Sequence, residues 1–260
     1  MSDATIRRKV KWDSAAKTDV GVKRSVNEDA ILSRSDLGLW AVADGMGGHE
    51  VGDIASNMII EALNQLQAQP DLQQMVDAVE DILLKTNQEI LDYSEQNLDN
   101  STIGSTIVSL VIKGRVGVAL WVGDSRLYRL REGKLQRITR DHSRVEELIE
   151  QGVILPEEAK SHSESNVITR AIGVDDELCI EVCVFDTLLK DVYLLCSDGL
   201  HNTVDEQELA QIMSSNNLQT KVSQMIQRSI ENGAPDNVSA IVVKGEFEKV
   251  AMRELTADTF

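Results

Sequence analysis

The chain has 260 residues, of which 42% are hydrophobic and 27% charged, and its 26 Lys and Arg against 43 Asp and Glu give a formal net charge of −17. So acidic a chain is poorly suited to nucleic acids or anionic membrane surfaces, because both are held by an excess of cations. We therefore expect no nucleic-acid partner. No stretch approaches the roughly 18 apolar residues of a membrane-spanning helix, so no membrane span is expected either.

The N-terminal segment and the cysteines bear on the cellular compartment. Residues 1–12 (MSDATIRRKVKW) lack the apolar core of a signal peptide. The three cysteines, Cys179, Cys183 and Cys196, form no C-x-x-C pair and lie in apolar, strand-like segments. We expect reduced, buried thiols rather than a disulfide framework or a zinc site, and hence a cytoplasmic location.

Apolar residues at helical spacing predict helices in three places. The first helix carries Ile54, Met58, Ala62 and Leu66, and a second, longer one covers 72–90. A third is predicted around 222–230, where Asn232 and Gly233 would end it.

The other apolar runs are typical of strands. They cover 30–33, 38–43, 105–112, 116–122, 126–130, 178–184, 192–196 and 238–243. Short turns at 113–115 and 131–133 favour antiparallel hairpins over βαβ units. Segment 144–166 is polar and is predicted to be a helical insertion lying over a surface. We predict one α+β domain over residues 1–260, with helices packed on antiparallel sheets.

Acidic residues stand at the ends of several predicted strands. Asp44, Asp124 and Asp198 follow apolar runs, whereas Glu28, Asp29 and Asp236 precede them. In an antiparallel sheet the exit of one strand and the entry of its neighbour share an edge, so all six acids could gather on one rim.

Clustered carboxylates repel one another and stay ionised only where a cation neutralises them. Oxygen ligands without Cys or His favour a hard ion, so Mg²⁺ or Mn²⁺ is expected ahead of zinc. Gly45 and Gly199 each follow an acid, and a residue without Cβ lets the backbone approach an ion closely. Arg24, four residues before Glu28, could fork onto a phosphate.

Eight segments occur in an order that resembles a known family. They are RSVNEDA (24–30), VADGMGGHEVGDIAS (42–56), GSTIVSLVI (104–112), VGDSRLYRL (122–130), DHS (141–143), NVITRAIG (166–173), LLCSDGL (194–200) and APDNVSAIVV (234–243). Over about residues 10–243 the chain resembles the metal-dependent Ser/Thr protein phosphatases of the 2C type, in their bacterial form.

The resemblance implies a four-layer α-β-β-α sandwich, in which two central antiparallel β-sheets are flanked by helices and metals lie at one rim. Segment 144–166 matches the flap beside the site. The matched site residues are Asp44 (the carboxylate bridging two metals), Gly45 (a backbone carbonyl ligand), Asp198 and Asp236 (ligands of the first metal), Glu28 (the second metal's position), Asp29 (the acid that holds metal-bound water), Asp124 with Asp198 (the third-metal site of bacterial members) and Arg24 (the phosphate-binding arginine).

The activity that the resemblance implies is hydrolysis of phosphoserine and phosphothreonine on proteins. Water bridging two Mn²⁺ or Mg²⁺ ions would attack phosphorus directly, and a third ion is implied for bacterial members. The implied partners are phosphorylated proteins, namely Ser/Thr kinases and their substrates, and a monomer is the family's default state.

One position departs from the eukaryotic pattern. Met46 stands where those members carry the histidine that protonates the leaving alkoxide, and a thioether has no proton to give. Water at a third ion or bulk water would have to supply the proton, with His49 a weaker candidate. His142, within the DHS motif, is expected to order a loop.

The alternative hypothesis is that the chain is a catalytically inactive relative, which binds phosphoproteins as a regulatory module. Such a protein should have lost metal ligands, whereas every expected acid is present here. We therefore favour catalysis.

Overall fold

The computed structural model describes residues 10–47, 51–98, 101–215 and 217–247. Its strands are β1 (Val10–Asp19), β2 (Asp29–Arg34), β3 (Leu39–Gly47), β4 (Ile103–Ser105), β5 (Ile107–Lys113), β6 (Val116–Val122), β7 (Arg126–Arg131), β8 (Lys134–Arg137), β9 (Glu181–Asp186), β10 (Val192–Cys196) and β11 (Val238–Phe247). Its helices are α1 (Gly52–Asn64), α2 (Leu72–Asn97), α3 (Arg144–Glu150), α4 (Asp198–His201), α5 (Glu206–Met213) and α6 (Leu218–Glu231), with a 3₁₀ helix η1 (Pro156–Ser161).

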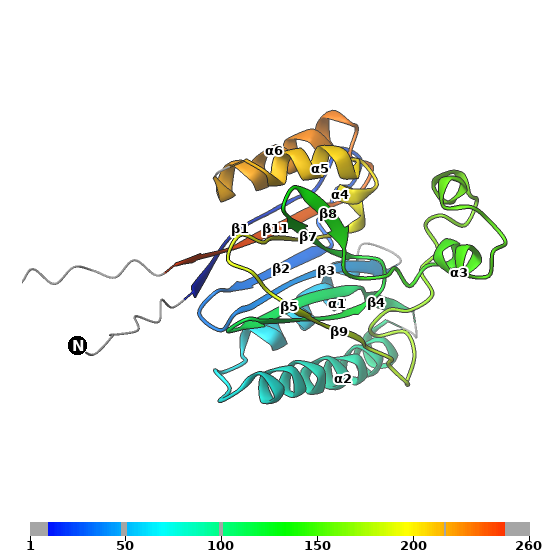
Figure 1. Cartoon of the computed structure of the whole chain (residues 1–260). Coiled ribbons are helices and arrows are strands. Elements are labelled where there is room, and N and C mark those ends of the chain that lie inside the picture. The colour runs from blue at the N-terminus through cyan, green and yellow to red at the C-terminus, as the bar shows by residue number, and fades with distance from the viewer. Residues whose placement is uncertain (1–9, 48–50, 99–100, 216, 248–260) are drawn as a thin grey trace, which may run out of the picture.

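The strands form two sheets that pack face to face. The first sheet has the order β1-β11-β10-β7-β8, and the second has the order β2-β3-β5-β6-β9 with β4 paired to β3. The strand pairs in both are antiparallel. Helices α5 and α6 cover the first sheet, while α1 and α2 cover the second (Figure 1). The predicted four-layer α-β-β-α sandwich is confirmed.

The sequence of β3 explains how one strand can serve two hydrophobic layers. Successive side chains of a strand point to opposite faces. Leu39, Ala41 and Ala43 pack toward α1 and α2, whereas Trp40 and Val42 enter the layer between the sheets. The run LWAVA is therefore apolar without alternation, because both of its faces are buried.

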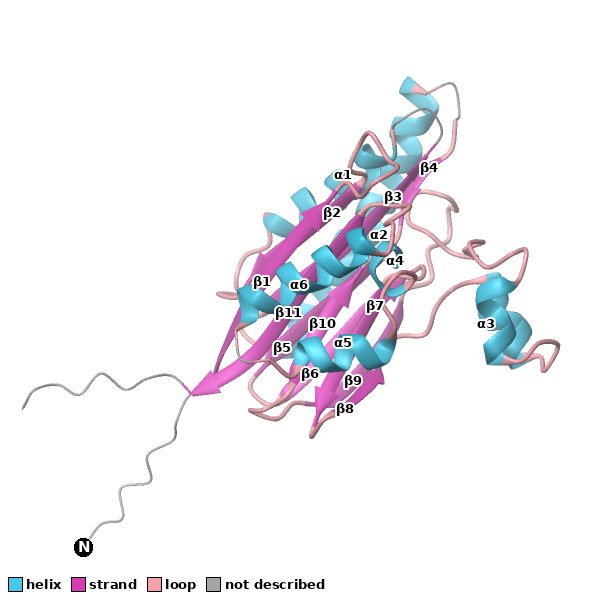
Figure 2. Cartoon of the chain, turned by 90° about the horizontal axis from the view of Figure 1, so that it is seen from above, coloured by secondary structure: helices cyan, strands magenta, loops and turns pink. Residues whose placement is uncertain are grey.

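The three predicted helices are present as α1, α2 and α6. At the start of α2 the Asp71 side chain accepts a hydrogen bond from the Gln74 N–H. At the end of α6, Asn232 is the C-cap and Gly233 follows at φ +94°. Segment 144–166 carries α3 and η1 and projects from one end of the sandwich (Figure 2).

Some elements differ from the prediction. The strand expected over 105–112 divides at Thr106, and the one expected over 178–184 begins only at Glu181. Strands β1 and β8 and helices α4 and α5 were not predicted. Strand β1 (VKWDSAAKTD) lies at the edge of the first sheet, next to β11. Edge strands carry polar side chains, and those of β1 interrupt the apolar run by which a strand is recognised.

The expectation of three buried thiols is wrong in part. Cys196 in β10 is buried, Cys183 in β9 is half-buried and Cys179 is exposed, and all three are free thiols. Cys179 precedes β9, so it lies in a loop rather than in the apolar strand assigned to it. No helix among the described residues is long and apolar enough to span a membrane.

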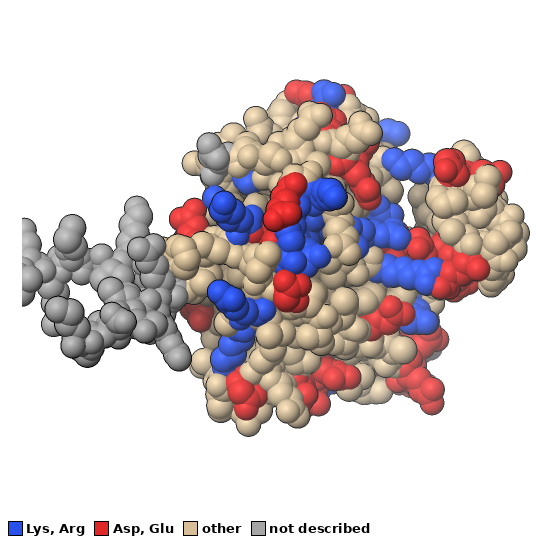
Figure 3. Space-filling view, in the orientation of Figure 1, with Lys and Arg blue, Asp and Glu red and all other residues tan. Residues whose placement is uncertain are grey.

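The net charge of −17 is not spread evenly over the molecule. On the face shown in Figure 3, Lys and Arg side chains gather near the centre, over the area where Figure 1 places β7 and β8. Segment 126–140, which contains β7 and β8, has six Lys and Arg and one acid, Glu132. The surface of this acidic protein therefore mixes charges of both signs.

Candidate active site

A cavity of about 710 Å³ lies at the end of the sandwich nearest the flap. Its walls come from strand ends and the segments next to them, and most of the residues predicted for the site face it. These are Arg24, Glu28, Asp44, Gly45, Asp124, Asp198 and Asp236. Antiparallel pairing therefore brings to one rim the acids that follow β6 and β10 and the acids that precede β2 and β11.

Asp29 is the one predicted site residue that does not line this cavity. It lies directly opposite Asp44 in the β2–β3 pair and is buried. Its Oδ2 accepts a hydrogen bond from Ser197 Oγ at 2.7 Å, whereas Oδ1 is buried with no hydrogen-bond partner among the described residues. Asp29 is thus a buried neighbour of Asp44 in the adjacent strand.

Arg24 is held at the cavity by two of the carboxylates. Its Nη2 lies 2.8 Å from Asp236 Oδ2 and its Nη1 lies 3.7 Å from Glu28 Oε2. The side chain is nevertheless 47% exposed, so part of the guanidinium stays open to a ligand. The hydrogen bond to Asp236 raises the pKa of Arg24 above its ordinary value, so this group stays cationic.

The Asp44–Gly45 segment fits tightly between α1 and the chain before β2. A Cβ on Gly45 would lie 2.2 Å from the Gly52 carbonyl oxygen and 2.7 Å from that of Glu28, so only glycine fits here. The Gly52 N–H at the start of α1 donates to Glu28 Oε1 at 3.0 Å, which fixes this carboxylate at a helix N-terminus.

Thr106 is a site residue that sequence reasoning missed. Its Oγ1 accepts a hydrogen bond from the Asp44 N–H at 3.2 Å and lies 2.8 Å from Ser125 Oγ, which follows Asp124. It therefore links the chain segments that carry two of the acids. Its presence in the GSTIVSLVI motif, at the break between β4 and β5, was the available signal.

The buried acids are electrostatically strained. Burial, followed by repulsion from Asp29 and other carboxylates, raises the pKa of Asp44 well above its ordinary value. Burial and the charge of Asp198 raise the pKa of Asp124 to about 7. Burial and the charge of Asp236 raise the pKa of Asp198 to about 6, and burial raises the pKa of Asp29 to about 7. At neutral pH this cluster favours either protons or a bound cation.

The donor set suits a hard divalent ion. Carboxylate oxygens and the Gly45 carbonyl are the ligands that Mg²⁺ and Mn²⁺ prefer, and the unpartnered Asp29 Oδ1 is one more oxygen without a proton donor. Among the described residues, however, no three His, Cys, Asp or Glu side chains are already arranged to hold an ion.

Asn237 joins the two sides of the site. Its role was not predicted from the sequence, although it follows Asp236 in the APDNVS segment. It is buried, and its Oδ1 accepts a hydrogen bond from the Glu28 N–H at 2.9 Å. Its Nδ2 donates to the carbonyls of Val20 and Val26, each at 2.9 Å. A single amide thus fixes the loop that carries Arg24 against the start of β11.

Replacing Asn237 by Ala should lower the free energy of unfolding of the metal-free protein by roughly 3 kcal/mol, because three backbone groups lose their partners. Urea denaturation would measure the loss. Asn232→Ala is the matched control, since Asn232 makes one exposed bond to the Thr203 carbonyl and should cost less than about 1 kcal/mol. Equal losses in the two variants would refute the role given to Asn237.

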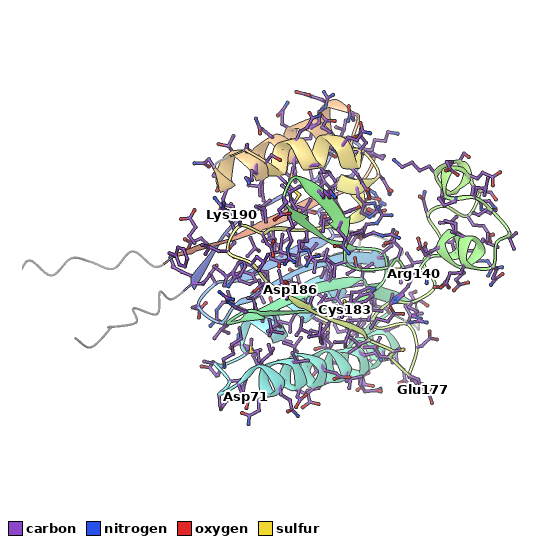
Figure 4. The ribbon with its side chains drawn as sticks, viewed as in Figure 1. Asp71, Arg140, Glu177, Cys183, Asp186 and Lys190 are labelled. Atoms are coloured by element: carbon purple, nitrogen blue, oxygen red, sulfur yellow. The ribbon has the colours of Figure 1, made fainter. Side chains whose placement is uncertain are left out.

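The flap forms one side of the cavity. Val145, Lys160 and Asn166 are among its lining residues. Arg140, labelled in Figure 4 where the chain leaves the sandwich for α3, pairs with Glu146 and Glu150 of that helix. Ion pairs therefore tie the base of the flap to the strands beneath it.

Met46 lines the cavity next to Gly45, at the position where the eukaryotic members carry a histidine. His49 lies outside the described residues. Of the other histidines, His201 is buried and lines the cavity, while His142 is buried just beyond it. Burial lowers the pKa of His201 to about 3 and that of His142 below its ordinary value, so both rings are neutral.

Proteins with this sequence pattern and fold are known. The serine/threonine phosphatase stp of Listeria monocytogenes is 35% identical over 239 residues, which cover 89% of this chain and 95% of that protein. The structure of PppA of Pseudomonas aeruginosa matches with a TM-score of 0.84 at 38% identity, over 92% of this chain and 100% of that one. A structure of the PstP catalytic domain in complex with two manganese ions matches with a TM-score of 0.81 at 31% identity, over 91% and 99%.

The family model described as protein phosphatase 2C matches residues 21–240, a span that begins before Arg24 and ends after Asp236. It therefore includes all the residues that line the cavity and the strands from β2 to β10. The chain belongs to the protein phosphatase 2C family.

Proposed function

We propose that this chain is a metal-dependent protein serine/threonine phosphatase and that the cavity at the end of the sandwich is its active site. The observation that carries the proposal is the meeting of the five predicted acids Glu28, Asp44, Asp124, Asp198 and Asp236 with the half-exposed Arg24 in one cavity. Relatives named serine/threonine phosphatases, which match nearly 90% of the chain, support the same conclusion.

The acids would hold two Mn²⁺ or Mg²⁺ ions, a number supported by the PstP structure with two manganese ions. Asp44 would be a ligand of both ions and Gly45 would offer its backbone carbonyl as a further ligand, while Asp198 and Asp236 would hold the first ion and Glu28 would serve the second. Asp124 and Asp198 would form a third position. When bound, such ions polarise the phosphoryl group and lower the pKa of a coordinated water so that it can attack phosphorus.

Arg24 is placed to bind the phosphoryl group of the substrate. Asp236 and Glu28 hold its guanidinium from one side, which leaves N–H donors directed at solvent in the cavity. A planar guanidinium can donate two parallel hydrogen bonds to phosphoryl oxygens, and those bonds strengthen as charge develops in the transition state. Holding the group in one orientation also aligns phosphorus for attack.

This chain has a methionine at the position of the eukaryotic histidine. Met46 lines the cavity and cannot donate a proton. We propose that water in the cavity protonates the leaving serine or threonine oxygen. Asp29, buried beside Asp44, would add its negative charge to that of the acids lining the cavity.

The substrates would be phosphorylated proteins that approach over the flap, because α3 and the residues after η1 form one cavity wall. We propose Ser/Thr kinases and their substrates as the partners, a monomeric enzyme, and one phosphatase domain whose core spans about residues 10–243.

The proposal predicts that the purified protein releases phosphate from a phosphothreonine peptide in the presence of Mn²⁺. Chelation should lower the rate by roughly 1,000-fold, since a Lewis acid contributes several kcal/mol to such a transition state. Restoring Mn²⁺ should restore the rate. Absence of turnover with both Mn²⁺ and Mg²⁺, together with retained binding of the phosphopeptide, would support the inactive, phosphoprotein-binding module instead.

A further inference from the structure

The turn that carries Asp124 is held by two histidines to which the proposed chemistry gives no role. Gly123 and Asp124 connect β6 to β7, and Gly123 adopts φ +102°. A Cβ on Gly123 would lie 2.6 Å from the Cβ of Thr106, so the turn passes tightly over that side chain. Packing therefore leaves the backbone little freedom, and its polar groups need fixed partners.

His142 contacts the Gly123 residue through two hydrogen bonds. The Gly123 N–H donates to the ring nitrogen Nδ1 at 3.0 Å, and the His142 N–H donates to the Gly123 carbonyl at 2.9 Å. The ring stacks on Trp121 with 6.1 Å between centroids and 18° between planes. Its Nε2 lies 3.2 Å from Glu181 Oε1. Position and orientation of this ring are thus fixed from three directions.

His201 holds the next residue from the other side. It lies at the end of α4, and its Nε2 is 3.1 Å from the carbonyl oxygen of Asp124. Its Nδ1 is buried and has no hydrogen-bond partner among the described residues. The single N–H of this ring therefore donates to the backbone carbonyl of Asp124.

These contacts determine which nitrogen carries the proton in each ring. His142 Nδ1 accepts a hydrogen bond, so the proton sits on Nε2 and faces Glu181. A carbonyl oxygen can only accept, so His201 must also carry its proton on Nε2. Both rings are neutral Nε2–H tautomers.

We propose that His142 and His201 are positioning residues that aim the Asp124 carboxylate into the cavity and thereby set the affinity of the ion that Asp124 shares with Asp198. The inference rests on the proposed function, because it takes Asp124 as a metal ligand. Partners that orient ligands in this way typically change metal affinity by about 10- to 100-fold when they are lost.

Matched substitutions separate the hydrogen bonds from the bulk of the rings. His142→Phe and His201→Phe keep a ring and remove the bonds, whereas His142→Asn returns an acceptor near the Nδ1 position and His201→Gln returns a donor near Nε2. His162→Phe is the control, since the His162 ring on the flap contacts only the Glu164 N–H among the described hydrogen bonds.

Titration of the metal-free proteins with Mn²⁺ by calorimetry is the test. The two Phe variants should bind the weakest ion about 10- to 100-fold less tightly, with the stronger ions unaffected. The Asn and Gln variants should recover most of that affinity, and His162→Phe should match the wild type. Wild-type affinity in both Phe variants, or losses in the Asn and Gln variants as large as in the Phe variants, would overturn the proposal.

Asp124→Asn distinguishes this inference from the proposed function. If it binds every ion as the wild type does, the metal assignment of Asp124 is wrong and the positioning role is lost with it. If it loses the weak ion while the Phe variants keep it, only the positioning role is wrong. Nitrogen-15 NMR of the wild type gives a readout that needs no variant to fold. It should show both rings as Nε2–H tautomers with a coupling across the Gly123 N–H to Nδ1 bond, and an Nδ1–H ring would overturn the inference.

Discussion

Replacing Asp44 by Asn is expected to reduce phosphopeptide hydrolysis by at least about 1,000-fold, because the residue proposed to bridge both ions would lose the charge that binds them. The amide keeps the shape of the side chain, so the fold should persist. The metal-free variant should melt at a temperature no lower than the wild type, since the substitution removes a buried charge that its neighbours repel. Initial rates with saturating Mn²⁺ and thermal denaturation would measure the two effects.

Asp36→Asn is the control for this experiment. Asp36 is an exposed acid in the β2–β3 connection that pairs with Arg34, far from the cavity lining. Its replacement should leave the rate unchanged. An Asp44→Asn enzyme that retains more than about a tenth of the activity would contradict the assignment of Asp44 as the bridging ligand.

The metal-free wild type should lose stability relative to Asp44→Asn as the pH rises above about 4, the ordinary pKa of an Asp carboxyl. A carboxyl whose pKa is higher in the folded than in the unfolded chain binds more protons when folded, so the free energy of unfolding falls as pH rises through that range. Burial and neighbouring charges raise the pKa of Asp44 well above its ordinary value, and those of Asp29 and Asp124 to about 7.

Comparison with the variant is needed because other groups act in the same interval with the opposite sign. His142 and His201 have lowered pKa values, so they add stability as the pH rises toward their ordinary range. Subtracting the urea-unfolding free energies of wild type and Asp44→Asn at each pH cancels the histidines. A difference that stays constant with pH would contradict the strained cluster, and saturating Mn²⁺ should reverse the trend by replacing protons on the carboxylates.

Many of the strands can be predicted from apolar runs in the sequence. Runs such as those of β6 and β10 are buried on both faces and are recognisable as uninterrupted apolar segments. Strands β1 and β8 lie at the two edges of the first sheet, where polar side chains interrupt the pattern. Edge strands owe their place to pairing with a neighbour, which local composition does not reveal.

The residues of the site, like the strands, could be predicted from the sequence only in part. Acids at the ends of apolar runs are visible in the sequence, and antiparallel pairing brings them together as expected. Whether an acid lines the cavity depends on its burial in the folded chain, and Asp29, although paired with Asp44 in the β2–β3 register, is buried outside the cavity lining. Thr106 and Asn237 act through hydrogen bonds to the backbone of segments distant in sequence, so their roles appear only when the fold is known.

If carboxylates from separate strand ends bind divalent ions in one cavity, anomalous X-ray diffraction from crystals of this protein soaked in Mn²⁺ should locate those ions. This arrangement of ligands predicts manganese peaks between Asp44, the Gly45 carbonyl, Glu28, Asp198 and Asp236, with a weaker peak beside Asp124. A map without peaks at these carboxylates, from crystals of protein that hydrolyses phosphopeptides, would contradict it.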